Sequence, residues 1–404
     1  MSGTSQTRAR SADPRDCVVV AFARTPFGRF GGALSALDVA ALGRLAIDEA
    51  VARARIDAEA VEALYAGVAM IGGAMLTPAR RMVLASSLPE RTPSLAVDRA
   101  CCSGLTALAL ARRQILAGEA DLVIAGGVEA LSATPRLLPR EMRMRPGPVA
   151  ADDPLTLRAP FLDKAIAAYT GEEALRNGVT RRMQDEWALE SHGRYFEGEA
   201  AGHFAAERFA VDMPQARLAT DEQPRRDTSL EKLAALATIY GGPTVTAGNA
   251  PGLSDGAAFL VLASRAFATA HGLAIRATLR AHAEVAGGPT SGTSTPAEAI
   301  RAVIARAGLG IADMRLVEIN EAFAATPLVS TLRLADGDPG EARSLRARTN
   351  LHGGAVAIGH PLGASGARLV MTLAASLERL GGGAGVAAIC GGFGQGDAMI
   401  VEVA

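Results

Sequence analysis

Three glycine-rich segments constrain what this chain can fold into more than any other feature. They lie far apart in the sequence, at residues 97–105, 353–361 and 388–396. The first contains Cys101, the second His360 and the third Cys390. We interpret the segments around the two cysteines as turns that lead from a strand into a helix. Because glycine lacks a Cβ atom, the backbone at such turns can approach a ligand closely.

Strands and helices alternate in two parts of the chain, which predicts an α/β fold with parallel sheets covered on both faces. In the first part we expect strands at 18–23, 61–70 and 122–125, the last ending at Gly126-Gly127, and helices at 37–54 and 103–118. In the second part we expect strands at 275–285, 316–319 and 386–390, and helices at 297–307 and 364–380. The shared order of elements indicates an internal duplication.

The segment between these parts differs in character. Arginines, prolines and acidic residues crowd positions 135–160, and a helical pattern with Trp187 follows at 182–202. We interpret the segment as an inserted loop domain, which commonly supplies substrate contacts. At 404 residues the chain also exceeds the usual limit of one core. The predicted organisation is a disordered tail (1–16), an N-terminal half (17–131 plus 249–274), an inserted loop domain (132–248) and a C-terminal half (275–404).

The composition gives no reason to expect nucleic acid or a membrane as a partner. Lys and Arg number 41 against 42 Asp and Glu, so the formal net charge is -1. No apolar stretch uninterrupted by glycine or charge reaches the roughly 18 residues of a membrane span. The polar start of the chain lacks the apolar core of a secretory signal. We therefore expect a cytoplasmic protein.

The four cysteines indicate neither a disulfide framework nor a metal centre, since no CxxC pair or HExxH motif occurs. Cys101, Cys390 and His360 together suggest covalent catalysis on an acyl group. A cysteine that opens a helix lies in the positive potential of the helix N-terminus, which favours the nucleophilic thiolate. A lone cysteine is more often a small buried hydrophobic residue, and we prefer that reading for Cys17 and Cys102. Surface or structurally satisfied histidine is the better interpretation of His192, His203, His271 and His282.

Five motifs make the chain resemble the thiolase family, the coenzyme A-dependent acyltransferases that make or cleave 3-ketoacyl thioesters. Each motif alone is weak evidence, whereas five in the right order are strong. The resemblance runs from about residue 18 to the C-terminus and implies two duplicated α/β halves in a layered αβαβα arrangement with an inserted loop domain. The motifs are Cys101-Cys102-Ser103-Gly104, Thr246-Ala247-Gly248-Asn249 with Ser254-Asp255-Gly256-Ala257-Ala258, Asn320-Glu321-Ala322-Phe323-Ala324, Gly359-His360-Pro361 and Cys390-x-Gly-x-Gly-x-Gly.

The resemblance also implies a role for each motif. Cys101 would carry the acyl group after passing its proton to His360, and Cys390 would remove a proton from the α-carbon of a second thioester. His360 and a water held by Asn320 would form one oxyanion hole. The backbone N–H groups of Cys101 and Gly392 would form the other. Acyl-CoA and coenzyme A would be the partners, coenzyme A as substrate and no cofactor permanently bound, in a homodimer or homotetramer. The expected substrate contacts are Arg225, Ala247, Pro251, Phe323 and His352.

Most departures from the family's motifs lie on the acyl and pantetheine side of the site. Pro251 stands where many relatives carry a serine that contacts the pantetheine arm, and Asp98 replaces a common asparagine. A Met-Gly-x-Thr-Ala-Glu pattern is hardly visible near 167–173, and residues 292–296 replace a Met-Gly-Thr-Gly-Pro segment. The catalytic motifs are intact, whereas the choice of acyl group is open.

Two rival functions fit parts of the pattern. A condensing enzyme of the ketoacyl synthase kind would pair one cysteine with two histidines, and Cys390 in place of a histidine argues against it. A catalytically silent, thiolase-like subunit that binds acyl-CoA is the other alternative, which Pro251 keeps open. The complete set of Cys101, Asn320, His360 and Cys390 argues against that alternative. We therefore predict an acyl-CoA:acetyl-CoA C-acyltransferase with a ping-pong mechanism through acyl-Cys101.

Overall fold

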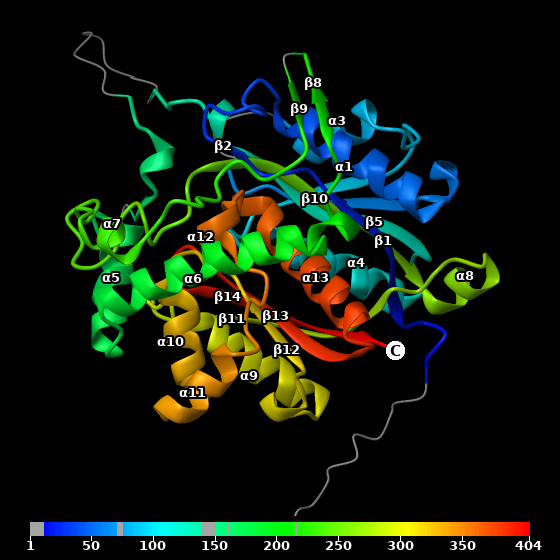
Figure 1. The fold of residues 1–404 in the computed structure, drawn as a ribbon. Coiled ribbons are helices and arrows are strands. Elements are labelled where there is room, and N and C mark those ends of the chain that lie inside the picture. Colours follow the sequence, from blue (N-terminus) through cyan, green and yellow to red (C-terminus); the bar gives the residue numbers. More distant parts are fainter. Residues whose placement is uncertain (1–11, 71–75, 139–150, 160, 215) are drawn as a thin grey trace, which may run out of the picture.

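The computed structural model describes residues 12–70, 76–138, 151–159, 161–214 and 216–404 (Figure 1). Two similar half-sheets form the centre of the molecule. Their strand orders are β1-β10-β5-β3-β4 and β11-β14-β13-β12. In each half-sheet two antiparallel pairings are followed by parallel pairing, two such pairs in the first half-sheet and one in the second. The halves meet through two residue pairs between β1 and β11. The strands are β1 (Cys17–Arg24), β3 (Ala63–Gly67), β4 (Ser94–Val97), β5 (Leu122–Ala130), β10 (Ser254–Ser264), β11 (Ala277–Ala286), β12 (Leu316–Ile319), β13 (Gly383–Gly391) and β14 (Gln395–Val403), with β2 (Gly28–Arg29) beside β10.

The helices form the remaining layers, and the layered α/β arrangement is confirmed. Figure 1 shows α4 (Ser103–Ala117) and α13 (Leu362–Arg379) between the half-sheets, α1 (Val39–Ala54) and α3 (Pro78–Ala85) above them, and α9 (Thr295–Ala307) below. Every residue of α13 from Leu362 to Leu377 is buried, because both faces of this helix pack against other elements. The outer helices also include α8 (Arg265–Ala270), α10 (Ala325–Leu334) and α11 (Pro339–Arg346).

Glycines let the central helices and β5 come unusually close. A Cβ atom on Gly104 of α4, or on Gly127 of β5, would overlap the carbonyl oxygen of Gly363 at the start of α13. The prediction that the strand ends at Gly126-Gly127 is therefore wrong, since β5 continues through both residues to Ala130. These two glycines provide room for neighbouring backbone rather than a turn.

Two further expectations need correction. The sheets are mixed rather than wholly parallel, and the Cys390 segment joins β13 to β14 in a hairpin, so it is not a turn from a strand into a helix. A connection this short can only join antiparallel strands. Phe393 and Gly394, at its tip, have φ values of 64° and 75°, which place them in the left-handed region. The Cys101 segment does lead from strand β4 into helix α4, as predicted.

Ordered contacts begin before residue 17, where the predicted disordered tail was to end. Asp13 and Asp16 close a turn, with the Asp16 N–H donating to the Asp13 carbonyl at 2.9 Å. The Arg15 guanidinium donates to the Ala120 carbonyl and pairs with Asp121. Residues 13–16 therefore do not belong to a disordered tail, because these contacts tie them to the end of α4 and the start of β5. Residues 1–11 lie outside the described residues.

The segment predicted as an inserted loop domain adds no described strand to the main sheet. Its strands β6 (Arg158–Ala159) with β7 (Lys164–Ala165), and β8 (Val211–Met213) with β9 (Ala216–Leu218), form two separate ribbons. Its helices are α5 (Ile166–Arg176), α6 (Arg181–Ala200) and α7 (Leu230–Ala234), and α6 packs on α12 (Ala355–Ile358) of the core. The exact domain boundaries stay a prediction. Among the described helices, none combines the length and apolar character needed to cross a membrane.

Candidate active site

The Cys390 hairpin lies directly against the Cys101 turn, although 289 positions separate the two cysteines in the sequence (390 minus 101). A Cβ atom on Gly391 would lie 2.9 Å from the Arg99 carbonyl oxygen and 3.0 Å from the Cys102 sulfur. A Cβ atom on Gly392 would lie 3.6 Å from that of Ala100. A side chain at Gly391 would push the turns apart, whereas one at Gly392 would only touch Ala100, so it is Gly391 that lets the two turns lie this close.

Cys101, Cys390 and His360 all line one cavity of about 190 Å³. Its walls also include residues of the inserted segment, such as Leu157, Ile166 and Tyr169. The three glycine-rich segments of the sequence therefore converge on one cavity, which the inserted segment helps to enclose.

Cys101 follows a strained residue at the start of α4. Ala100 has a φ of 50°, in the left-handed region that costs a residue with a side chain roughly 1–3 kcal/mol. The Asp98 carboxylate accepts a hydrogen bond from the Ala100 N–H at 2.9 Å, and the Ser103 hydroxyl donates to the Ala100 carbonyl at 2.5 Å. These contacts hold the strained turn in the shape that presents Cys101 to the cavity.

Burial reverses the expected effect of the helix on Cys101. Burial, with smaller contributions from Cys390 and Glu129, raises the pKa of the Cys101 thiol. Desolvation of the charged form therefore outweighs the helix potential, which favours the thiolate. Cys101 rests as a thiol and needs a base.

His360 is held by hydroxyl groups on both sides. Gly359, with a φ of 99°, turns the chain so that the His360 N–H donates to the Ser254 hydroxyl at 2.9 Å. The imidazole Nδ1 lies 2.6 Å from the Ser365 hydroxyl, which itself donates to the Pro361 carbonyl at 3.0 Å. Since the Ser365 proton is used for Pro361, its oxygen accepts from Nδ1–H, and the unprotonated Nε2 is left for the site.

The Nε2 atom faces Asn320, whose amide nitrogen lies 3.4 Å away. Burial, with a contribution from the Arg368 charge, lowers the pKa of His360 to about 3, so the ring is neutral at physiological pH. The Asn320 side-chain oxygen is buried and has no hydrogen-bond partner among the described residues. Asn320 therefore offers an unused acceptor next to the base, which is compatible with the water-holding role that the resemblance implies.

Cys390 is buried near the end of β13 and also rests as a thiol. Burial, with a smaller contribution from Glu173, raises the pKa of Cys390 to about 12. Thr326, at the start of α10, is the polar neighbour that opposes this shift. The site thus holds two neutral thiols and one neutral imidazole, so charge develops only when a substrate reacts.

Glu321 forms hydrogen bonds to several segments around Asn320, a role that the sequence did not reveal. Its buried carboxylate accepts hydrogen bonds from Trp187 Nε1 at 2.9 Å and Ser191 Oγ at 2.8 Å, both on α6. It also accepts from Asn350 Nδ2 and the Val356 N–H, each at 3.0 Å. One side chain therefore joins the inserted segment, the end of β12 and the start of α12.

The predicted substrate contacts divide into two groups. Pro251 and Phe323 line the cavity, whereas Ala247 and Arg225 lie on the exposed surface and outside its walls. The prediction that His352 lines the site needs correction. Its ring stacks on that of His203, with centroids 4.0 Å apart, and does not reach the cavity. The local motif could not show this, because the direction of the side chain depends on the packing of α6 behind it.

Sequence reasoning also missed Ser365 and Tyr169. Ser365 follows His360 by five positions on the first turns of α13, so helical spacing contained a signal for it. Tyr169 had no such signal, because its place in the cavity depends on how α5 packs. Among the described residues no group of three metal-ligating side chains occurs, and all four cysteines are free.

Comparisons with known proteins agree along the whole chain. Residues 17–266 match the family model described as Thiolase, N-terminal domain, and residues 273–403 match Thiolase, C-terminal domain. A probable acetyl-CoA acetyltransferase of Mycolicibacterium smegmatis is 39% identical, covering 95% of this chain and 100% of that protein. A beta-ketoadipyl-CoA thiolase of Pseudomonas knackmussii is 38% identical, covering 96% and 99%. The crystal structure of human mitochondrial 3-ketoacyl-CoA thiolase in complex with CoA superposes with a TM-score of 0.90 at 31% identity, covering 97% and 98%.

Proposed function

This chain belongs to the thiolase family, and on that premise we propose that Cys101 carries the acyl group in a ping-pong reaction. The activity is that of the acetyl-CoA acetyltransferases and 3-ketoacyl-CoA thiolases. One observation carries the proposal for the site: Cys101, His360 and Cys390 line a single cavity. Coenzyme A takes part as a substrate.

Cleavage of a 3-ketoacyl thioester begins with Cys101. Its sulfur attacks the C3 carbonyl while its proton passes to Nε2 of His360, which is unprotonated in the resting site. The bond between C2 and C3 then breaks and leaves the enolate of acetyl-CoA. Cys390, a thiol with a pKa of about 12, gives its proton to C2 of this enolate. The products of this half are acyl-Cys101, acetyl-CoA and a Cys390 thiolate beside protonated His360.

The second half restores both thiols. The Cys390 thiolate takes the proton of incoming coenzyme A, whose sulfur then attacks acyl-Cys101. The released Cys101 thiolate recovers its proton from His360, so atoms and charge balance. Run in reverse, the same steps condense two thioesters. The N–H groups of Cys101 and Gly392 would stabilise one oxyanion, and His360 with a water held by Asn320 the other; such donors contribute about 3–4 kcal/mol each.

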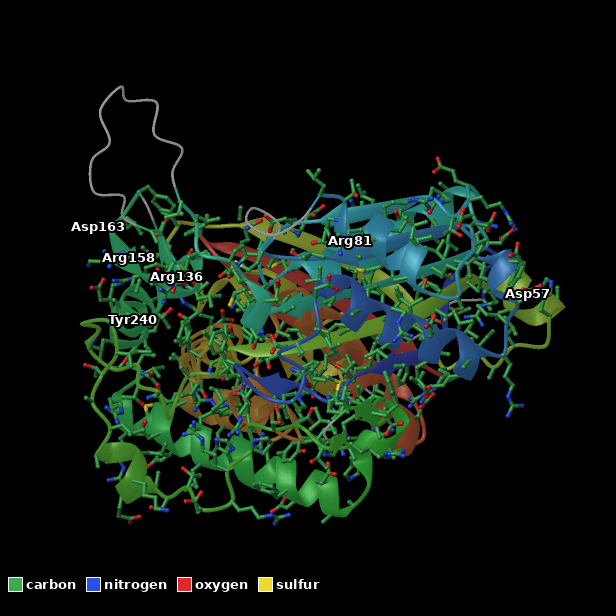
Figure 2. All side chains as sticks on the ribbon, turned by 90° about the horizontal axis from the view of Figure 1, so that it is seen from above. Asp57, Arg81, Arg136, Arg158, Asp163 and Tyr240 are labelled. Carbon is green, nitrogen blue, oxygen red and sulfur yellow. The ribbon has the colours of Figure 1, made fainter. Side chains whose placement is uncertain are left out.

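The entrance that we assign to coenzyme A carries aromatic and cationic side chains. Figure 2 shows Tyr240, which lines the cavity, at the same end of the molecule as Arg136 and Arg158. Both arginines are largely exposed and pair with aspartates, Asp153 and Asp163. Together with Arg225 they are the cations that we propose for the phosphate groups, because guanidinium groups bind phosphate well.

A homodimer or homotetramer is also part of this proposal. Strand β4 lies at the edge of the sheet, and its outer edge has no partner among the described strands. Its Leu95 side chain is half exposed, which supports pairing with a second copy. The cytoplasmic location stays a prediction.

Incubation with acetyl-CoA should add one acetyl group to Cys101. We expect peptide mass spectrometry to find the label on the peptide with Cys101, and fragmentation to separate it from the adjacent Cys102. Cys102 is fully buried, so it should stay unlabelled. A label confined to Cys102 would contradict the assignment, and an unlabelled wild-type protein would favour the silent acyl-CoA-binding subunit.

Replacing Pro251 by serine should tighten the binding of coenzyme A thioesters. Proline offers neither a hydroxyl nor an N–H, and one neutral hydrogen bond contributes roughly 0.5–1.5 kcal/mol. We therefore expect Pro251→Ser to lower the KM for acetoacetyl-CoA by up to about tenfold, with kcat changed only a few-fold. Pro89→Ser, at a partly buried proline outside the cavity, is the matched control. An unchanged or higher KM would mean that other groups hold the pantetheine arm.

A further inference from the structure

Tyr169 contains the one tyrosine hydroxyl among the described residues that is both buried and without a hydrogen-bond partner. The residue is 2% exposed, on the first turn of α5. The other buried tyrosine, Tyr195, has the Arg208 guanidinium 3.4 Å from its hydroxyl, and Tyr65 donates to Gln114 at 3.1 Å. A buried hydroxyl without a partner destabilises the fold, and phenylalanine would fill the same space at no such cost. Its presence therefore points to a partner that arrives with a ligand.

The position of Tyr169 indicates which ligand provides this partner. Tyr169 lines the cavity that holds both thiols, and its nearest ionisable neighbours are Cys390, Cys101 and Glu173. Burial raises the pKa of the phenol, so it keeps its proton and can donate. The Phe393 N–H faces the same oxygen without reaching hydrogen-bonding geometry, and it could only donate. The Tyr169 proton is thus free for an acceptor on the acyl group.

The walls of the cavity disfavour a carboxylate as this acceptor. Among the described residues that line it there is no Lys, Arg, Asp or Glu, and burial keeps His360 neutral. A carboxylate on the acyl chain would therefore lose its hydration without meeting a cation, which is costly. The other hydroxyl groups among the described wall residues belong to Thr156, Thr170, Tyr240 and Thr326.

The reaction itself leaves Tyr169 without an acceptor. A 3-ketoacyl thioester has oxygens on C1 and C3. In the proposed function these already have donors: protonated His360 with a water held by Asn320, and the N–H groups of Cys101 and Gly392. We infer that the acyl group of this enzyme carries an additional, uncharged oxygen beyond C3, and that Tyr169 donates a hydrogen bond to it. This inference rests on the proposed function. The inferred hydrogen bond makes Tyr169 a specificity-determining residue for acyl chains with a hydroxy or oxo substituent.

Three six-carbon thioesters test this inference in the thiolysis direction: 3-oxohexanoyl-CoA, 5-hydroxy-3-oxohexanoyl-CoA and 3-oxoadipyl-CoA. The wild-type enzyme should cleave the hydroxylated thioester with a kcat/KM about 5- to 150-fold above that of the alkyl thioester, the range that one buried hydrogen bond supplies. The carboxylated thioester should be the poorest of the three. Tyr169→Phe should bring the hydroxylated and alkyl thioesters within about threefold of each other. Tyr195→Phe, an equally buried tyrosine outside the cavity, should leave the wild-type ratio unchanged.

The outcomes separate this inference from the proposed function. If the wild-type protein cleaves none of the three thioesters and also fails on acetoacetyl-CoA, the proposed function itself is wrong. If it cleaves them but does not prefer the hydroxylated thioester, the inference is overturned while the function stands. A preference that persists in Tyr169→Phe also overturns it. The wild-type comparison needs no variant, so the test holds even if Tyr169→Phe folds poorly.

Discussion

Cys390→Ala should still form the acyl-enzyme from acetyl-CoA and lose the carbon–carbon step by about 10²- to 10⁴-fold, the usual contribution of a general acid or base. The reason is that only protonation and deprotonation at C2 need the Cys390 thiol. Acylation of Cys101 needs a base for its own proton, and that base is His360. In His360→Ala we therefore expect acylation itself to slow by a similar factor.

Two measurements on the same samples separate these roles. The intact mass after incubation with acetyl-CoA reports acylation, and thiolysis of acetoacetyl-CoA reports the whole reaction. Cys17→Ala is the matched control, because Cys17 is a buried cysteine of β1 outside the cavity. It should leave both readouts near the wild-type level. Equal losses of acylation in Cys390→Ala and His360→Ala would contradict this division of labour.

Glu321→Ala should lower the free energy of unfolding by at least about 3 kcal/mol. The change leaves four donors without their acceptor, on Trp187, Ser191, Asn350 and Val356, and all of them are buried. Hydrogen bonds to a charged acceptor contribute about 1.5–3 kcal/mol each, and water entering the space left by the side chain recovers part of the loss. Denaturant unfolding of the full chain measures the effect.

The control for this prediction is Glu190, a glutamate on α6 itself. Glu190 pairs with Arg194 at 2.6 Å, but half of its side chain is exposed. Glu190→Ala should therefore cost no more than about 1 kcal/mol, as is usual for exposed ion pairs. Glu321→Gln keeps the size of the side chain and should lie between the two. A loss below about 1 kcal/mol in Glu321→Ala would show that the inserted segment is held to the core by its apolar contacts instead.

Short-range patterns in the sequence determined the reacting groups and some of the elements, although not the strands β10 and β14. A strand such as 316–319 or a helix such as 103–117 depends on the residues within it, so its bounds matched the prediction within a residue. Cys101, His360 and Cys390 lie in motifs of a few adjacent residues. The glycines in these motifs indicate close backbone contact, although they do not say which segment makes that contact. The resemblance then added the order of the motifs, which one chain's periodicity alone does not contain.

Only the tertiary structure decided how these groups behave. The helix potential at Cys101 is a local property, but the burial that outweighs it also depends on segments distant in the sequence, such as the Cys390 hairpin. His352 and Tyr169 show the same dependence in opposite directions, since packing of the inserted segment turns one away from the cavity and brings the other into its wall. Gly126 and Gly127 look like the end of a strand until β10 is seen against the first and α13 against the second. Desolvation and close packing depend on every neighbour in space, and those neighbours are set by the fold of the whole chain.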